Sequence, residues 1–96
     1  NRIFGLKIVF MEILFHKNFK KGYKKLPSKI QQKFKERLKL FVNDPYGPLL
    51  NNHALHGKWQ EFRSINVTYD IRAIFKPINN QTVEFALIDS HSNLYN

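Results

Sequence analysis

The architecture of this chain is set by residues 58–89, which read KWQEFRSINVTYDIRAIFKPINNQTVEFALID. Apolar and β-branched residues recur there in short runs separated by turn signals, a pattern typical of strands. We predict three strands, at residues 59–65, 67–76 and 82–89, with turns near Asn66 and at residues 77–80. Because strands that follow one another in sequence tend to pair, they should form an antiparallel meander.

Two helices are predicted upstream of the meander. The first is short, basic and weakened by Gly22, and its apolar residues recur at helical spacing: Phe19, Tyr23 and Leu26. Pro27 stands at the first turn of the second helix, which runs from Ser28 to about Val42. The apolar stripe of this helix should pack on a sheet and consists of Ile30, Phe34, Leu38 and Phe41.

The remaining segments complete an α+β order of β-α-α-β-β-β. Residues 7–15 are rich in Ile, Val, Leu and Phe and predict a first strand. The loop at residues 43–52 holds two prolines and a glycine, and residues 91–96 are expected to form a tail or a single turn. A chain of 96 residues supports one hydrophobic core, so we predict a single domain over residues 1–96. The only methionine is Met11, and residues 1–10 either belong to this domain or form an N-terminal extension.

The net charge of +9 is large for a domain of this size and favours a polyanionic partner. Ten of the sixteen basic residues lie between Lys17 and Lys39, where Glu36 is the only acid, so the helical pair carries most of the charge. The absence of cysteine excludes disulfides and fits a cytoplasmic location. The apolar run at residues 3–15 is interrupted by Lys7 and Glu12 and is shorter than a membrane span, so no membrane partner is expected.

Polar and aromatic residues gather just before the meander, in NNHALHGKWQEFRSI at residues 51–65. His53 and His56 have a spacing that suits zinc, but without cysteine and without an evident third ligand we expect no metal and no cofactor. His56 and His16 are interpreted as ordinary surface residues.

The element order, together with LHGKWQEFR before the meander, VTYDIRAIF within it and DSHSNLY at the end, resembles the RelE/ParE superfamily of bacterial toxins. The chain is most similar to the YafQ-like branch, over about residues 11–96. The most specific feature is the pairing of NHALHGKW with a terminal SHSNLY. The resemblance implies a RelE-like fold with two N-terminal helices packed on a small, mostly antiparallel sheet. It further implies a type II toxin that cuts messenger RNA at the ribosome without a metal.

The resemblance also assigns site residues. His53 matches the branch's histidine ahead of Leu-x-Gly, Asp70 its acid on the middle meander strand, and His91 its C-terminal catalytic histidine. Arg63 matches an arginine on the first meander strand, and Tyr95 falls where the branch has an aromatic residue. Two positions depart from the pattern.

Those departures are Asn66, where a further histidine is expected, and Leu87, where an arginine is expected on the last strand. Arg72 follows Asp70 by two residues, which places both on one face of a strand, and could supply the missing cation. This compensation is inferred from the alternation of strand residues and not from the family.

RNA cleavage without a metal requires a base for the 2′-hydroxyl, cations for the phosphate and an acid for the departing 5′-oxygen. Histidine suits the acid and base roles because its ordinary pKa of about 6.5 keeps both forms populated near neutral pH. We therefore expect His91 as general acid, His53 as general base, and Arg63 and Arg72 on the phosphate. Asp70 is expected to orient its neighbours.

RNA binding is expected of Lys58, Trp59 and Tyr95, the two rings serving as stacking surfaces. Each assignment has a structural alternative. His53 could brace a loop, Trp59 could be core, Tyr95 could pin the tail, and Arg63 and Arg72 could form ion pairs with Asp70 or Glu61. In addition, the loop before a meander and the tail after it lie at opposite ends of the strands unless the loop folds back along the sheet.

Three functions remain open from the sequence: an endoribonuclease toxin, a ParE-like toxin that binds gyrase without cutting, and an inactive nucleic-acid-binding relative. The two histidines favour the nuclease. The departures at Asn66 and Leu87 leave the inactive relative as an alternative. The resemblance implies a cognate antitoxin with an acidic segment that folds on binding, in a toxin–antitoxin hetero-oligomer.

Overall fold

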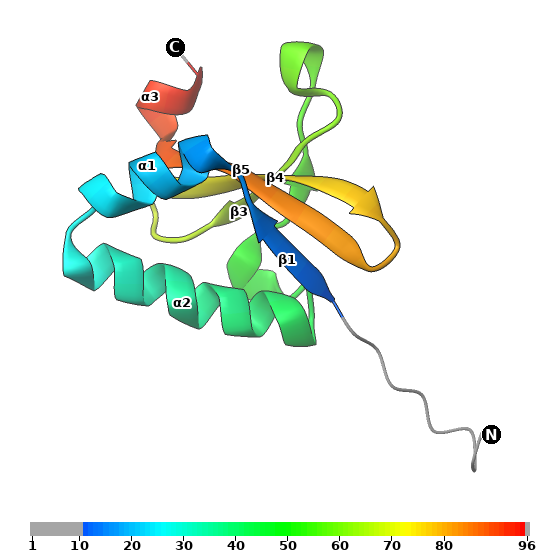
Figure 1. Ribbon diagram of the computed structural model, residues 1–96, viewed down its shortest axis with the longest axis horizontal. Helices are drawn as coiled ribbons and strands as arrows, with labels where there is room; N and C mark the ends of the chain where they lie inside the picture. The colour runs from blue at the N-terminus through cyan, green and yellow to red at the C-terminus, as the bar shows by residue number, and fades with distance from the viewer. Residues whose placement is uncertain (1–10, 96) are drawn as a thin grey trace.

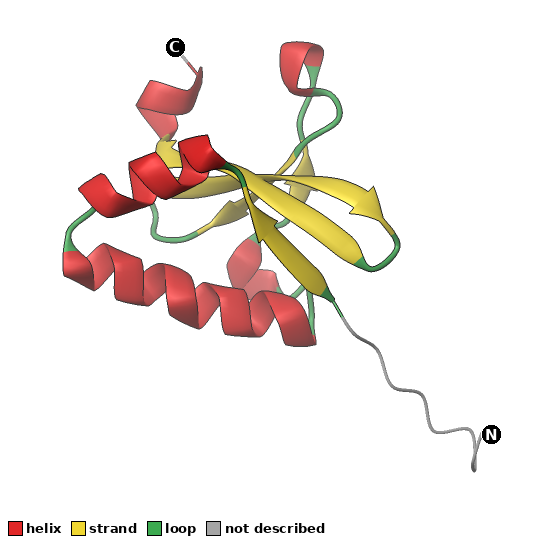
Figure 2. Ribbon diagram, in the orientation of Figure 1, coloured by secondary structure: helices red, strands yellow, loops and turns green. Residues whose placement is uncertain are grey.

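The computed structural model describes residues 11–95, which fold into a five-stranded sheet with helices on both sides (Figures 1 and 2). The order along the chain is β1 (Glu12–Phe15), α1 (Lys17–Lys25), α2 (Ser28–Asn43), β2 (His53–Ala54), β3 (Arg63–Asn66), β4 (Ile71–Asn79), β5 (Thr82–Ser90) and α3 (His91–Tyr95). Two short 3₁₀ turns, η2 (Pro48–Leu50) and η3 (Gly57–Trp59), flank β2. The predicted α+β class and the predicted order of its main elements are confirmed.

The sheet has the order β1-β5-β4-β3-β2. The β3–β4–β5 meander is antiparallel, as predicted, and β2 adds an antiparallel edge strand. β1 pairs with β5 in parallel, and the chain between these two strands carries α1, α2 and the strands β2, β3 and β4. Residues 7–10 of the predicted first strand lie outside the described residues.

Three boundaries within the meander differ from the prediction. Trp59 lies in η3, so the first strand begins only at Arg63. Asn66 is still in that strand, and the turn follows at residues 67–70, where the Thr68 hydroxyl accepts hydrogen bonds from the backbone of Asp70 and Ile71. β4 extends through Pro77 to Asn79, and its register with β5 shifts between Ile74 and Phe75 and between Pro77 and Asn79. The strand boundaries depend on pairing with neighbouring strands, which the local turn residues do not determine.

The core lies between the sheet and the two basic helices, and its centre is aromatic. Phe85 on β5 contacts the rings of Phe15, Phe19, Phe34 and Phe41 at centroid distances of 5.5–5.9 Å. The predicted stripe on α2 divides by depth: Phe34 and Phe41 are buried, and Ile30 and Leu38 are partly buried against the cluster. His16 caps α1, its Nδ1 accepting a hydrogen bond from the backbone of Asn18.

Gly22 sits where α1 packs closely against β5. A Cβ atom at this position would lie 2.9 Å from the backbone oxygen of Ile88. Alanine has the better helix propensity by about 1 kcal/mol, yet we expect Gly22→Ala to destabilise the fold by about 1–3 kcal/mol because α1 must shift away from the sheet. Urea unfolding followed by circular dichroism measures this, with Lys21→Ala as the control on an exposed position of the same helix. A gain in stability for Gly22→Ala would contradict the close packing.

Within residues 11–95, no helix has the length and apolar character that a membrane span requires. The same residues contain no cluster of three or more histidine, cysteine, aspartate or glutamate side chains that could hold a metal ion.

Candidate active site

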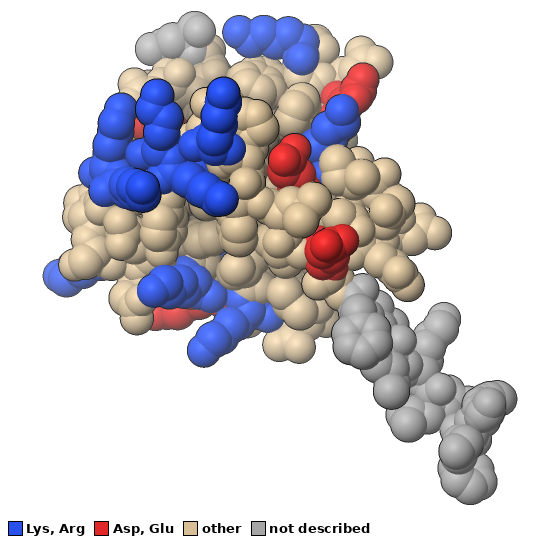
Figure 3. Space-filling model, viewed as in Figure 1, with Lys and Arg blue, Asp and Glu red and all other residues tan. Residues whose placement is uncertain are grey.

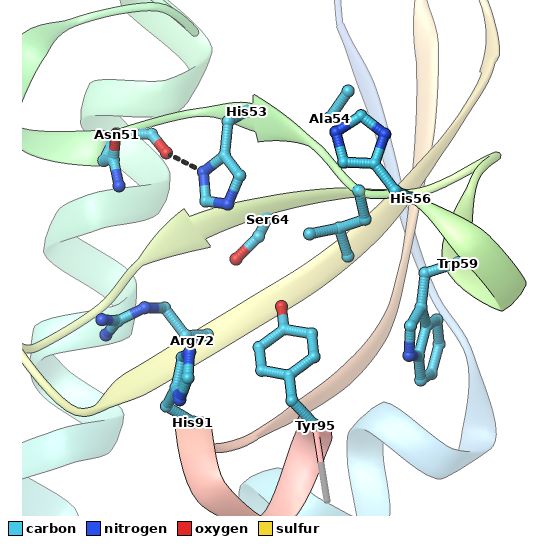
Figure 4. A pocket seen from close by; sticks show the side chains of 10 residues that line it. Asn51, His53, Ala54, His56, Trp59, Ser64, Arg72, His91 and Tyr95 are labelled. Carbon is cyan, nitrogen blue, oxygen red and sulfur yellow. Dashed lines mark hydrogen bonds between the residues drawn. The ribbon is translucent and has the colours of Figure 1, made fainter.

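A cleft of about 490 Å³ opens on the face of the sheet that points away from the aromatic core. Figure 4 shows the side chains that line it. They come from the loop around β2, from β3, from β4 and from α3: Asn51, His53, Ala54, Leu55, His56, Trp59, Ser64, Arg72, His91 and Tyr95. Strand alternation explains the face, because Ser64 and Arg72 alternate with Ile65 and Ala73, which are buried in the core on the other side.

The edge strand β2 brings His53 to this cleft. It folds back along β3, so that His53 is the partner of Ser64. The separation expected between the loop and the C-terminal tail is thereby removed, since β3 is only four residues long. His53 Nδ1 lies 2.8 Å from the carbonyl oxygen of Asn51, whose left-handed φ of 47° turns the chain into the strand. A ring nitrogen facing a carbonyl carries the hydrogen, so the neutral imidazole presents Nε2 as a proton acceptor.

His91 opens the short helix α3, which is tied to the β3–β4 turn. The backbone N–H of His91 donates to the carbonyl oxygen of Asp70 at 2.8 Å. At the start of the helix, the Ser90 hydroxyl accepts from the backbone of Asn93, whose side-chain amide donates to Asp89. The His91 ring lies 4.8 Å from the Tyr95 ring. These contacts fix the two rings on one side of the cleft (Figure 4).

Arg72 lies on β4, between the histidines in the lining of the cleft. Its Nη1 donates to the carbonyl oxygens of Thr68 at 2.9 Å and Ile71 at 3.4 Å. Both hydrogen bonds use one nitrogen, which leaves the rest of the guanidinium fork for a ligand. Neither of the ion pairs found in residues 11–95 involves Arg72; they join Lys33 to Glu36 and Lys76 to Glu61.

Three predicted residues do not line the cleft. Arg63 points to the opposite face, where Nε donates to the Asn52 side chain at 2.8 Å and the guanidinium lies 5.4 Å from the Tyr46 ring. Asp70 lies in the turn before β4 and not on the strand, with an exposed side chain. Lys58 is exposed on η3, and its Nζ lies 5.9 Å from the Trp59 ring. The alternation of β3 places Arg63 away from Ser64, and the sequence alone did not fix that phase.

Trp59 combines partial burial with a position in the lining of the cleft. Its ring lies edge-to-face against Phe62 at 5.5 Å. Its Nε1 is buried and has no hydrogen-bond partner among the described residues.

Sequence reasoning missed Ser64, which is fully buried and lines the cleft. A serine in a strand gives no signal of its own. Once the strand start at Arg63 and the buried position of Ile65 are known, the period of two identifies Ser64 as the residue on the other face. His56, interpreted as a surface residue, also lines the cleft.

The family model for the bacterial toxin of type II toxin–antitoxin systems, YafQ, matches residues 11–96. The chain belongs to the YafQ toxin family. Among solved structures it is similar to YafQ from E. coli strain BL21(DE3), with 21% identity, a TM-score of 0.76, and coverage of 90% of this chain and 99% of that one.

Two complexes show the same fold. The toxin of the E. coli DinJ-YafQ toxin-antitoxin complex is 21% identical, with a TM-score of 0.75 over 92% of this chain and 100% of that one. The RelBE2 toxin-antitoxin complex from Mycobacterium tuberculosis matches at 16% identity, with a TM-score of 0.71 over 86% and 100% of the two chains. Comparison with curated protein sequences gives no match.

The two positions that depart from the YafQ pattern lie on the cleft side of the sheet. Asn66 pairs with Arg72 across β3 and β4, and its buried Oδ1 has no partner within residues 11–95. Leu87 pairs with Ile74, a fully buried residue that alternates with the core residues Ala73 and Phe75. At Leu87 the last strand therefore presents an apolar side chain on this face, and Arg72 is the arginine that lines the cleft.

Proposed function

We propose that this YafQ-family toxin is a metal-independent endoribonuclease that cuts messenger RNA on the ribosome. The observation that carries the proposal is that His53, Arg72 and His91 line one cleft, although they come from three separate elements of the chain. Two imidazoles and a guanidinium are the groups that this reaction requires.

The cleavage step assigns one task to each group. His53 Nε2 takes the proton of the ribose 2′-hydroxyl, and the 2′-oxygen forms a bond to phosphorus. The bond from phosphorus to the 5′-oxygen breaks, and protonated His91 gives its proton to that oxygen. The products are a 2′,3′-cyclic phosphate and a free 5′-hydroxyl. Arg72 stabilises the charge on the five-coordinate phosphate, since its fork matches the geometry of phosphate oxygens.

The remaining residues bind or position. Tyr95 and Trp59 line the cleft and offer rings on which bases can stack. Lys58, beside Trp59, is placed to meet the RNA backbone at the rim. Asp70 acts through its carbonyl oxygen, which holds the backbone of His91, and not through its carboxylate. We assign Arg63 no role in the reaction.

The test is mRNA cleavage mapped by primer extension in a translating extract, with and without a zinc-selective chelator that leaves the magnesium of the ribosome in place. Cuts at codon positions that persist with the chelator are expected. Loss of the cuts with the chelator that added zinc restores would overturn the metal-free mechanism. Intact message with inhibited DNA supercoiling would instead favour a gyrase-binding toxin, and intact message without either effect would favour an inactive relative.

An antitoxin is the partner that the family and the complexes above support, and the structure offers a surface for it. An apolar groove of about 350 Å³ between α1 and α2 is lined by Phe15, Phe19, Lys20, Tyr23, Lys24, Phe34, Lys35 and Leu38. A second hollow, of about 510 Å³, shares Lys35 and Leu38 and continues along α2. Figure 3 shows Lys and Arg side chains gathered over α1 and along α2. An apolar floor with a lysine rim fits an acidic amphipathic segment, which we propose as the bound part of the antitoxin.

Lys35→Glu is therefore expected to weaken antitoxin binding by about tenfold or more, because it places like charges against each other. Lys35 is exposed, so the change should leave the fold intact. Isothermal titration with the purified antitoxin measures the affinity. The matched control is Lys29→Glu, on the same helix but outside both hollows. Equal losses for both variants would show that the antitoxin responds to net charge and not to this groove.

A further inference from the structure

The buried polar atoms that lack a hydrogen-bond partner gather at the cleft. Within residues 11–95 there are three: Trp59 Nε1, Ser64 Oγ and Asn66 Oδ1. Trp59 and Ser64 line the cleft, and Asn66 lies two residues from Ser64 on the same face of β3. A buried hydroxyl without a partner destabilises a folded protein, so its presence calls for an explanation at that site.

Of these three atoms, the Ser64 hydroxyl oxygen is the best placed to bind a ligand. The residue is 0% exposed, yet its hydroxyl points into the cleft, in the middle of the ring formed by His53, Arg72, His91 and Tyr95 (Figure 4). It is also the strand partner of His53, and directly opposed residues hold their Cβ atoms about 4.5–5.5 Å apart. The hydroxyl thus stands between the candidate base on one side and the candidate acid on the other.

We propose that Ser64 is a catalytic residue whose hydroxyl donates a hydrogen bond to a non-bridging oxygen of the scissile phosphate. This inference rests on the proposed function. The phosphate must lie between the group that removes the 2′ proton and the group that protonates the 5′-oxygen, which is where the Ser64 hydroxyl points. A neutral donor fixed in a strand needs no reorganisation as charge grows on the phosphate, so its hydrogen bond strengthens in the transition state. The partner that Ser64 lacks in the free protein is then supplied by the substrate.

A structural role and a catalytic role predict opposite effects of Ser64→Ala. Removing an unpartnered buried hydroxyl should leave the unfolding midpoint in urea unchanged or higher. Catalysis should fall, because the loss of one hydrogen bond to a charged group lowers the rate by about 10–100-fold. The loss should appear in kcat, with KM changed less, since the bond is stronger in the transition state than in the ground state.

The experiment measures cleavage of a short messenger RNA bound to programmed ribosomes by the wild type, Ser64→Ala and Ser64→Thr, each with a normal linkage and with a phosphorothioate at the cleaved position. We expect Ser64→Ala to lose kcat, Ser64→Thr to retain part of it, and the penalty for sulfur in one stereoisomer to be smaller in Ser64→Ala than in the wild type. Wild-type kinetics for Ser64→Ala, or equal sulfur penalties in both proteins, would overturn the inference while leaving the nuclease intact. A wild type that cuts no RNA would end the proposed function and this inference together.

Discussion

Replacing His91 by alanine is expected to lower the single-turnover rate of RNA cleavage by about 10²–10⁴-fold, the usual contribution of a positioned proton donor. The fold should survive the change, because the contact that anchors α3 to the β3–β4 turn uses the backbone N–H of His91 and not its ring. What is lost is the proton for the departing 5′-oxygen. Rapid-quench assays on a defined message bound to ribosomes measure the rate, and circular dichroism checks the fold.

His56→Ala provides the matched control, since His56 also lines the cleft but has no assigned task. Its rate should stay within a few-fold of the wild type. A second test uses a substrate whose 5′-oxygen is a better leaving group, which needs no general acid. His91→Ala should cut that substrate almost as fast as the wild type does. A deficit that persists there would mean that His91 acts by positioning, and similar losses in both histidine variants would point to a general disturbance of the cleft.

Replacing Arg72 by alanine is the second large effect, with an expected loss of about 10²–10³-fold in the rate. The guanidinium is the charged group that lines the cleft, and Nη1 alone is used in its two hydrogen bonds to backbone oxygens. Arg72→Lys keeps the charge but loses the planar fork, so it should recover only part of the rate. Because the Nη1 bond to Thr68 also braces the turn before β4, unfolding in urea is measured for both variants.

Arg63→Ala separates charge from position. It removes an equal charge from the neighbouring strand, but its guanidinium lies on the other face against Tyr46. We expect a rate within a few-fold of the wild type. If Arg63→Ala abolished cleavage while Arg72→Ala did not, the phosphate would lie on the wrong face of the sheet in the proposed mechanism.

The sequence anticipated elements whose periodicity is strong. The helix predicted to start at Ser28 ends within a residue of the predicted position, since its apolar stripe faces the core throughout. The start of the meander was placed four residues early because Trp59 and Phe62 look like strand residues while they pack against each other in and after a 3₁₀ turn. The edge strand β2 has only two residues, too few for any periodicity to show.

For the candidate site, the residue types indicated which chemical groups to expect, but not which residues would lie together in the cleft. His53 and His91 are histidines, which can accept and donate protons, and the family resemblance assigned both to one active site. The resemblance also suggested Arg63 and the carboxylate of Asp70, but the structure places neither in the cleft. It gave no indication of Ser64. Whether a strand residue faces the cleft or the core depends on the phase of an alternation, and one uncertain boundary reverses that phase.

The sequence by itself determined the class of fold and the concentration of positive charge on the two helices, because these depend on composition and on local periodicity. Its motifs before and after the meander gave the resemblance to the family. Tertiary structure alone decided that β2 folds back to place His53 beside Ser64, that the backbone of Asp70 holds His91, and that the cleft opens on the face away from the core. Each of these depends on pairing between residues distant along the chain, and such pairing is selected by burial of the whole core and not by any local segment.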